Sequence, residues 1–244
     1  MILRRDILLM LTVLLTGCAA SQGFDRQTMR ELFHHDPDVV TERDIHNTLE
    51  LKPQTSMPYR LGLYFVRKNV PMKQSVKKAD WHSVDKETLL RKLLPLRDEG
   101  VLTDVVMLAE TTLQGTGLRD IRLAGARYGA DAVLVVDGAA AVDRYNNGYA
   151  ALYATLVGAY FAPGTESSAL FMIEGSLWDV RSEFLYATQL VEGQSTSVGP
   201  AAMIEDRDVV AQAKAEALEE FGRRMENKLR LMKDDQDQAR RTSR

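Results

Sequence analysis

The sequence predicts an α/β domain: βαβαβ units followed by a β-hairpin and a long C-terminal helix, with helices packed on a mixed sheet. Short apolar runs alternate with segments of helical spacing between residues 59 and 137. Two longer segments of strand character then flank a turn at 181–183, and residues 206–233 have an apolar stripe of helical period. Alternating strands and helices indicate parallel strands joined by right-handed crossovers.

The chain begins with a segment typical of a cleaved export signal. Arg4 and Arg5 precede an apolar run of nine residues at 7–15. A helix that crosses about 30 Å of hydrocarbon needs roughly 20 apolar residues, so this run is too short to remain as a membrane span. The positive start, the short apolar core and the small residue Gly17 together predict a signal peptide over 1–17.

The residues Leu15, Thr16, Gly17 and Cys18 resemble a bacterial lipobox. In lipoproteins with this motif a peptidase cuts before the cysteine, and lipid is attached to its sulfur and its new amino terminus. The resemblance therefore implies lipidation of Cys18, and this covalent lipid is the only attached group that we expect, with no cofactor. The alternative is an ordinary secretory signal cut near residues 19–20.

Lipidation of Cys18 has two consequences. Several acyl chains make anchoring to a bilayer stable where one would be marginal. Because Cys18 is the only cysteine, no thiol is left for disulfides, metal binding or nucleophilic catalysis. The residues that follow (Ala19, Ala20, Ser21) lack the aspartate that resembles an inner-membrane retention signal. That resemblance implies the periplasmic side of the outer membrane.

Composition fits a single periplasmic domain. About 225 residues remain after the signal, and this length with 45% hydrophobic residues is ample for one core. The formal net charge of −3 is mildly acidic, whereas a nucleic-acid-binding protein needs a basic face. We therefore expect no nucleic acid among the partners.

A lipidated tether and N-terminal arm are expected over 18–57. The amphipathic segment 24–33 predicts a short helix, which Pro37 interrupts. A second short helix is predicted at 41–51, with Thr41 as its N-cap.

The globular domain is expected over 58–233. Its predicted elements, in chain order, are a strand at 59–66, a lysine-rich loop at 67–81, a helix from Asp85 to 94, a buried strand at 103–110, a helix at 118–128, a buried strand at 132–137, hairpin strands at 170–180 and 184–193, and a helix at 206–233. The run Ala-Val-Leu-Val-Val-Asp at 132–137 is the clearest buried strand. Residues 234–244 are charged and lack apolar anchors, so a disordered tail is expected there.

Two segments of this domain resemble known envelope proteins. Residues 124–135, AGARYGADAVLV, resemble the helix-to-strand passage of periplasmic α/β domains in the curli-secretion channel lipoprotein, the lipoprotein activators of peptidoglycan synthases and the amino-terminal domain of the Tol-Pal β-propeller protein. Residues 175–181, GSLWDVR, are similar to their late strands. The chain also looks like the uncharacterised rhombotarget lipoproteins. The resemblance covers roughly 59–233 and implies a fold and a compartment, but no activity.

The segment 145–165 contains no charged residue and is the candidate interaction surface. The residues expected to form that surface are Tyr149, Tyr153, Leu156 and Tyr160. Small residues recur every four positions (Ala150, Ala154, Gly158, Ala162), which on one helix would form a smooth stripe. Three interpretations stay open: a packed helical insertion, an oligomer-forming or membrane-touching element, and continued strands. Turn residues at 146–148 and 163–164 favour a discrete inserted element.

No motif predicts catalysis or metal binding. Adjacent His34 and His35 would point in different directions on a helix and match no zinc spacing, so a solvated arm is the expected state. The carboxylates Asp143, Glu174 and Asp179 could serve a cell-envelope hydrolase if they converged in one pocket. That enzyme is the alternative hypothesis.

The function that we expect is therefore non-enzymatic. The sequence predicts a lipid-anchored envelope protein, acting as a protein-binding or self-assembling module at the periplasmic face of the outer membrane. Its expected partners are the membrane, through the lipid on Cys18, and either another envelope protein or a second copy of the chain.

Overall fold

A computed structural model describes residues 20–33, 41–67, 76–115, 117–155 and 157–242. The strands form one six-stranded sheet of order β3-β1-β4-β5-β6, with β2 paired to β4. The strands are β1 (Tyr59–Phe65), β2 (Val76–Lys78), β3 (Leu102–Met107), β4 (Ala132–Asn146), β5 (Thr165–Asp179) and β6 (Leu185–Gly199). The helices are α2 (Arg26–Glu31), α3 (Glu42–Leu49), α4 (Ser83–Leu93), α5 (Pro95–Asp98), α6 (Leu118–Arg127), α7 (Gly158–Phe161) and α8 (Asp206–Thr242), with 3₁₀ turns η1 (Glu110–Thr112) and η2 (Gly148–Ala154).

The first half of the domain forms the predicted βαβαβ arrangement. Strand β1 is central and pairs in parallel with β3 on one side and β4 on the other. Leu89 and Leu93 of α4 pack with Leu61 of β1 in the main core, whereas Ile121 of α6 packs with Val133 on the opposite face. The helices therefore cover both faces of the sheet here, and the predicted fold class is confirmed.

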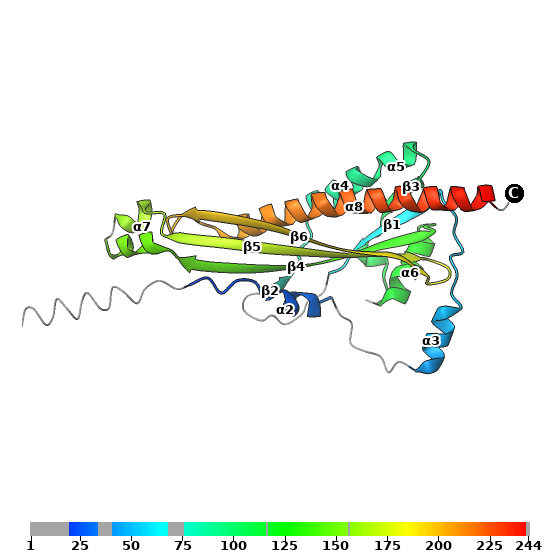
Figure 1. The fold of residues 1–244 in the computed structure, drawn as a ribbon, viewed down its shortest axis with the longest axis horizontal. Coiled ribbons are helices and arrows are strands. Elements are labelled where there is room, and N and C mark those ends of the chain that lie inside the picture. The colour runs from blue at the N-terminus through cyan, green and yellow to red at the C-terminus, as the bar shows by residue number, and fades with distance from the viewer. Residues whose placement is uncertain (1–19, 34–40, 68–75, 116, 156, 243–244) are drawn as a thin grey trace, which may run out of the picture.

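The second half is a long antiparallel ribbon. Strands β4, β5 and β6 each contain 15 residues, which corresponds to about 50 Å at 3.4 Å per residue. β4 and β5 stay paired as far as Asn146 and Thr165, well beyond the end of β1. The ribbon gives the molecule its elongated shape, with α7 at one end and β1, β3 and α6 toward the other (Figure 1).

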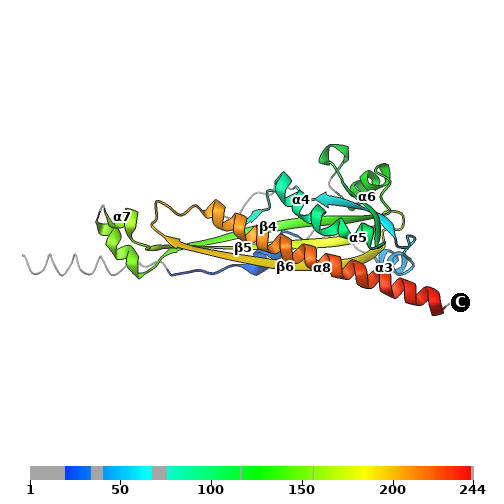
Figure 2. The same ribbon diagram turned by 90° about the horizontal axis from the view of Figure 1, so that it is seen from above.

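Helix α8 packs along one face of this ribbon (Figure 2). Phe221 and Met225 are fully buried against the sheet, as the predicted apolar stripe required. The helix comes so close to β6 that a Cβ on Gly193 would lie 2.3 Å from the carbonyl oxygen of Ala213. A side chain at Gly193 would therefore push the helix off the sheet.

The predicted disordered tail is wrong for residues 234–242, where α8 continues to Thr242. Two contacts explain the extra helix. The backbone N–H of Met57 donates to Oε1 of Gln236 at 2.7 Å, and Lys233 forms an ion pair with Asp237 at 3.0 Å. Residues 243–244 lie outside the described residues.

The N-terminal arm packs on the face of the ribbon opposite α8. Met29 of α2 is fully buried and, with Phe33, joins a cluster of Ala141, Leu170 and Met172. Both predicted arm helices are present, and Thr41 caps α3 as expected. Pro37 lies outside the described residues.

Some predicted boundaries differ from the structure. The predicted lysine-rich loop contains the short strand β2, which pairs with residues 139–141 of β4. The strand expected to be buried at 103–110 is β3, which lies at the sheet edge and is only partly buried. Helix α4 begins at Ser83, and Asp85 accepts a hydrogen bond from the backbone N–H of His82 at 2.8 Å. No helix among the described residues is long and apolar enough to cross a membrane.

Candidate functional site

The uncharged segment folds into a separate element at the end of the ribbon, between Asn146 of β4 and Thr165 of β5. It consists of η2 and α7, so the small residues that recur every four positions do not lie on one continuous helix. Thr155 adopts an extended conformation, with φ −104° and ψ 143°, and ends η2. We call residues 147–164 the tip.

The small residues of the tip allow close packing within it, instead of forming a stripe on one helix. A Cβ on Gly158 would lie 1.8 Å from the carbonyl oxygen of Leu152, and one on Gly164 would lie 2.6 Å from the backbone of Ala150. Asn147 closes the element, since its backbone N–H donates to the Gly164 carbonyl and its Nδ2 donates to the Pro163 carbonyl, both at 2.9 Å. The tip is therefore a compact fold with defined contacts.

The tip exposes large apolar side chains. The side chains that we call the apolar tip residues, with their exposed fractions, are Tyr149 (63%), Leu152 (52%), Val157 (67%), Tyr160 (57%) and Phe161 (76%). They come from a short segment that carries no compensating charge, since the nearest charged residues in sequence are Arg144 and Glu166. Isolated exposed apolar residues are common on soluble proteins, whereas large contiguous apolar patches are typical of interaction sites.

The residues predicted for the interaction surface differ in exposure. Tyr149 and Tyr160 are exposed, as expected, whereas Tyr153 is partly buried. The hydroxyl of Tyr153 lies 2.9 Å from Oγ1 of Thr165 and ties η2 to the start of β5. Leu156 lies outside the described residues. Leu152, Val157 and Phe161 belong to the surface as well, and their apolar character was the available signal in the sequence.

A second group of exposed apolar side chains lies at the same end of the ribbon. Gly199, the last residue of β6, pairs with Thr165, so the loop between β6 and α8 begins beside the tip. Val198 and Met203 are 54% and 68% exposed. Arg144 holds the start of α8 beside this loop through an ion pair with Asp206 at 3.1 Å.

The first described residues are fixed to the ribbon close to the tip. The carboxylate of Asp143 accepts hydrogen bonds from the hydroxyl of Ser21 at 2.5 Å and the backbone N–H of Gly23 at 2.9 Å. Asp143 is buried and lies three positions before the end of β4. Asp143 therefore fixes the start of the arm about 10 Å from the tip, at 3.4 Å per strand residue.

The arm runs along the ribbon toward the tip in the direction of its N-terminus. Phe33 and Met29 pack near Ala139 and Ala141, whereas Ser21 reaches Asp143. The lipobox residues Leu15, Thr16, Gly17 and Cys18 lie outside the described residues. Cys18 precedes Ser21 by three positions, so the chain allows at most about 10 Å between them.

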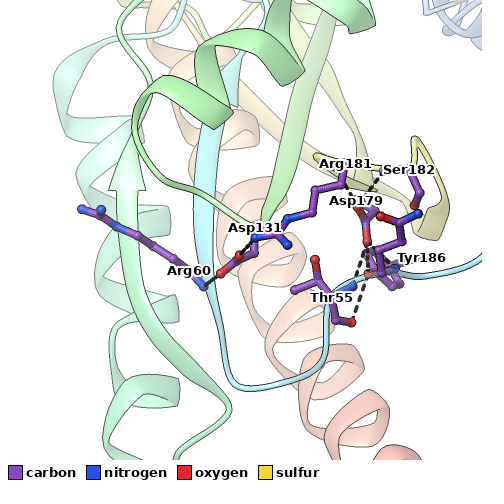
Figure 3. A network of polar contacts seen from close by, with 8 residues as sticks. Thr55, Arg60, Asp131, Asp179, Arg181, Ser182 and Tyr186 are labelled. Carbon is purple, nitrogen blue, oxygen red and sulfur yellow. Dashed lines mark hydrogen bonds and ion pairs between the residues drawn. The ribbon is translucent and has the colours of Figure 1, made fainter.

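A group of hydrogen bonds to Asp179, which we call the Asp179 hub, lies at the end of β5 opposite the tip. Figure 3 shows the carboxylate of Asp179 between the turn that follows β5, at Arg181 and Ser182, and the segment that leads into β1. The hydrogen bonds that Asp179 accepts come from the backbone N–H groups of Gln54 (2.9 Å), Thr55 (3.2 Å), Arg181 (2.8 Å) and Ser182 (3.0 Å) and from the hydroxyl of Tyr186 (2.7 Å). Burial raises the pKa of Asp179, but these hydrogen bonds outweigh it and hold the pKa at about 2. The carboxylate is thus a structural acceptor, held ionised.

An open cleft of about 510 Å³ lies beside this hub. Its walls come from residues 53–57, Tyr59, Tyr186 and the late part of α8 at 228–236. The hydroxyl of Tyr59 is buried without a hydrogen-bond partner among the described residues, and burial raises its pKa. The cleft therefore lies at the end of the ribbon opposite the tip.

The three dispersed carboxylates do not meet. Asp143 pairs in register with Ser168, which is six positions from Glu174 and eleven from Asp179 along β5. At 3.4 Å per residue these separations are about 20 Å and 37 Å, and Glu174 and Asp179 lie on opposite faces of their strand. Asp143 and Asp179 already bind backbone donors. The structure therefore contains no pocket that combines these carboxylates for hydrolysis.

The histidine positions give no metal centre among the described residues, where no three His, Cys, Asp or Glu side chains gather. His46 lies 3.3 Å from Glu50 on the exposed helix α3. His34 and His35 fall outside the described ranges.

Comparisons with known proteins add little to this geometry. No protein-family model and no curated protein matches the sequence. The hypothetical protein CT253 from Chlamydia trachomatis aligns with a TM-score of 0.35 and 10% identity, over 70% of this chain and 96% of that one. Protein XCC0632 from Xanthomonas campestris, of the family model DUF330, aligns with a TM-score of 0.28 and 12% identity, over 80% and 94%. The resemblance to the named envelope lipoproteins stays a prediction.

Proposed function

We propose that this chain is a lipid-anchored envelope protein that acts as a non-catalytic binding module at the periplasmic face of the outer membrane. Cys18 carries the lipid, and the tip is the surface that the module uses for binding. The partner classes are the membrane itself, another envelope protein and a second copy of the chain.

One observation carries this proposal. Asp143 fixes Ser21 and Gly23 near the tip and its exposed apolar residues, and Cys18 precedes Ser21 by three positions in the sequence. An anchor and an exposed apolar surface at one end of a long domain support an adhesion or assembly function. The separation of Asp143, Glu174 and Asp179 argues against the hydrolase alternative.

Acyl labelling tests the anchor. Cells that express the full chain are fed an alkyne fatty acid, and Cys18→Ala is compared with Ser21→Ala as a matched control three residues away. We expect Cys18→Ala to abolish labelling and leave an uncleaved precursor, whereas Ser21→Ala keeps both labelling and cleavage. Full labelling of Cys18→Ala would refute the proposal.

Membrane separation tests the compartment. The proposal expects the protein in the outer-membrane fraction of a density gradient. Ala19→Asp introduces the aspartate that resembles a retention signal, and the variant is expected to move to the inner membrane while it remains acylated. Recovery of the unaltered protein in the inner-membrane fraction would contradict the outer-membrane location.

A further inference from the structure

We propose that the apolar tip residues insert into the headgroup region of the same bilayer that holds the Cys18 lipid, so that the protein contacts the membrane at two adjacent points. This inference rests on the proposed lipid anchor and goes further, because it assigns the tip to lipid rather than to a protein partner.

The first argument is distance. Cys18 lies within about 10 Å of Ser21 along the chain. Ser21 binds Asp143, and Asp143 lies about 10 Å of strand before the tip. A lipid on Cys18 therefore keeps the tip within reach of the bilayer surface. The short connection also turns insertion of the tip into an intramolecular step with a high effective concentration.

The second argument is the chemistry of the exposed side chains. Tyr149 and Tyr160 each combine an apolar ring with a polar hydroxyl, which suits the boundary between headgroups and acyl chains. Val157 and Phe161 present 67% and 76% of their surface and contain no polar side-chain atom. Val198 and Met203 add apolar surface at the same end.

The third argument is charge. Residues 145–165 contain no Asp, Glu, Lys or Arg, so insertion does not require a charge to lose its water. The nearby Arg144 is already bound to Asp206 and to the carbonyl of Ala201. Because the segment provides no free cation for acidic lipids, docking is expected to be equally strong on zwitterionic and anionic bilayers.

The depth of insertion is limited by the backbone. Unpaired backbone N–H and C=O groups are costly in hydrocarbon, and the tip contains a 3₁₀ turn and one short helical turn rather than a continuous helix. The tip is therefore expected to lie in the interface, where water still satisfies these groups. Contact of this kind is typical of interfacial segments that lie on a membrane.

The test uses the full, acylated chain in vesicles of zwitterionic phosphatidylethanolamine and phosphatidylcholine. Phe161→Cys introduces a single free thiol, because the only natural cysteine carries the lipid, and a fluorophore is attached to it. Leu231→Cys is the matched control, since Leu231 is also apolar and 59% exposed but lies late in α8. A quencher on lipid acyl chains and a water-soluble quencher are then compared.

We expect the lipid quencher to act strongly at position 161 and weakly at 231, and the aqueous quencher to show the reverse order. Adding Val157→Asp should lower the lipid-contacting population at 161 by about tenfold, because an apolar contact is replaced by a charge. Val157 is exposed, so this change leaves the fold intact, which circular dichroism checks. Anionic lipid should not change the result.

Two outcomes would overturn the inference while leaving the anchor in place. Position 161 could be as accessible to the aqueous quencher as position 231 on acylated protein, in which case the tip remains in water. It could also be shielded from both quenchers and crosslink to a second copy, in which case the tip is a protein interface. Mass spectrometry of the same sample reports acylation at Cys18, and its absence would refute the proposed function together with this inference.

Discussion

At the scale of single residues, two buried aspartates organise the two ends of the ribbon. Asp143 fixes the start of the arm near the tip, and Asp179 joins β5, β6 and the entry to β1 at the other end. Both aspartates were named from the sequence only as carboxylates of the alternative hydrolase. Their long-range roles could not be predicted, since the N-terminal residues that they bind lie 120–125 positions away in sequence.

The Asp179 hub should dominate the stability of its end of the domain. Asp179→Ala removes the acceptor of four part-buried backbone N–H groups and of the Tyr186 hydroxyl, and is expected to lower the free energy of unfolding by about 2–4 kcal/mol. Urea unfolding followed by circular dichroism measures the change. Asp98→Ala is the control, because the side chain of Asp98 is 83% exposed, and it should have little effect.

The contribution of Asp179 should also depend on pH. Its pKa in the folded protein is about 2, below the ordinary value of the unfolded chain, so its stabilising effect is complete above about pH 4. That effect is lost as the pH falls toward 2. The difference in stability between the unaltered chain and Asp179→Asn is therefore expected to shrink from pH 5 to pH 2. A constant difference over that range would show that the carboxylate charge does not contribute.

At the scale of elements, strand positions were predictable and strand lengths were not. The continuous apolar run at 132–137 predicted the first part of β4 correctly. The remainder of β4, from Gly138 to Asn146, contains small and polar residues and is a strand because β5 pairs with it along its whole length. Such pairing depends on tertiary structure, so the local sequence pattern does not predict it.

The tip and the tail each contain contacts that the sequence pattern did not indicate. In the tip, backbone atoms of Leu152 and Ala150 approach Gly158 and Gly164 so closely that a side chain would not fit there. The two glycines therefore allow the chain to fold back on itself instead of continuing as one helix. In the tail, charge indicated disorder, but Gln236 binds the backbone of Met57, far away in sequence. The tail therefore depends on a contact between distant segments, whereas the tip contacts lie within residues 147–164.

The contact between α8 and β6 gives a matched pair of glycine substitutions. A Cβ at Gly193 would lie 2.3 Å from the Ala213 carbonyl oxygen and 2.5 Å from the Ala217 nitrogen, both rigid backbone atoms. Gly193→Ala is therefore expected to destabilise the fold by about 1–3 kcal/mol. Gly199→Ala, on the same strand, would meet only Ile204 at 3.5 Å and should be nearly neutral in thermal unfolding. Equal effects would mean that α8 is not tightly packed at Gly193.

At the scale of the whole molecule, the proposed arrangement has the anchor and the tip at one end, so that the ribbon would hold the opposite end away from the membrane. The cleft near Tyr59 and Tyr186 is then presented to the periplasm rather than to lipid. Leu231 follows Asp206 by 25 positions in one helix, which corresponds to about 40 Å at 1.5 Å per residue. An upright protein would therefore carry Leu231 at about that height above the bilayer.

Energy transfer from a donor on Leu231→Cys to acceptor lipids in the vesicle surface measures this height. We expect weak transfer, since about 40 Å separates the two, and stronger transfer when Asp143→Ala is added. That substitution removes the acceptor for Ser21 and Gly23, so the domain can tilt on a longer flexible tether while Cys18 stays acylated. Strong transfer from the unaltered ribbon would show that it lies along the membrane, and the arm would then not set the orientation of the domain.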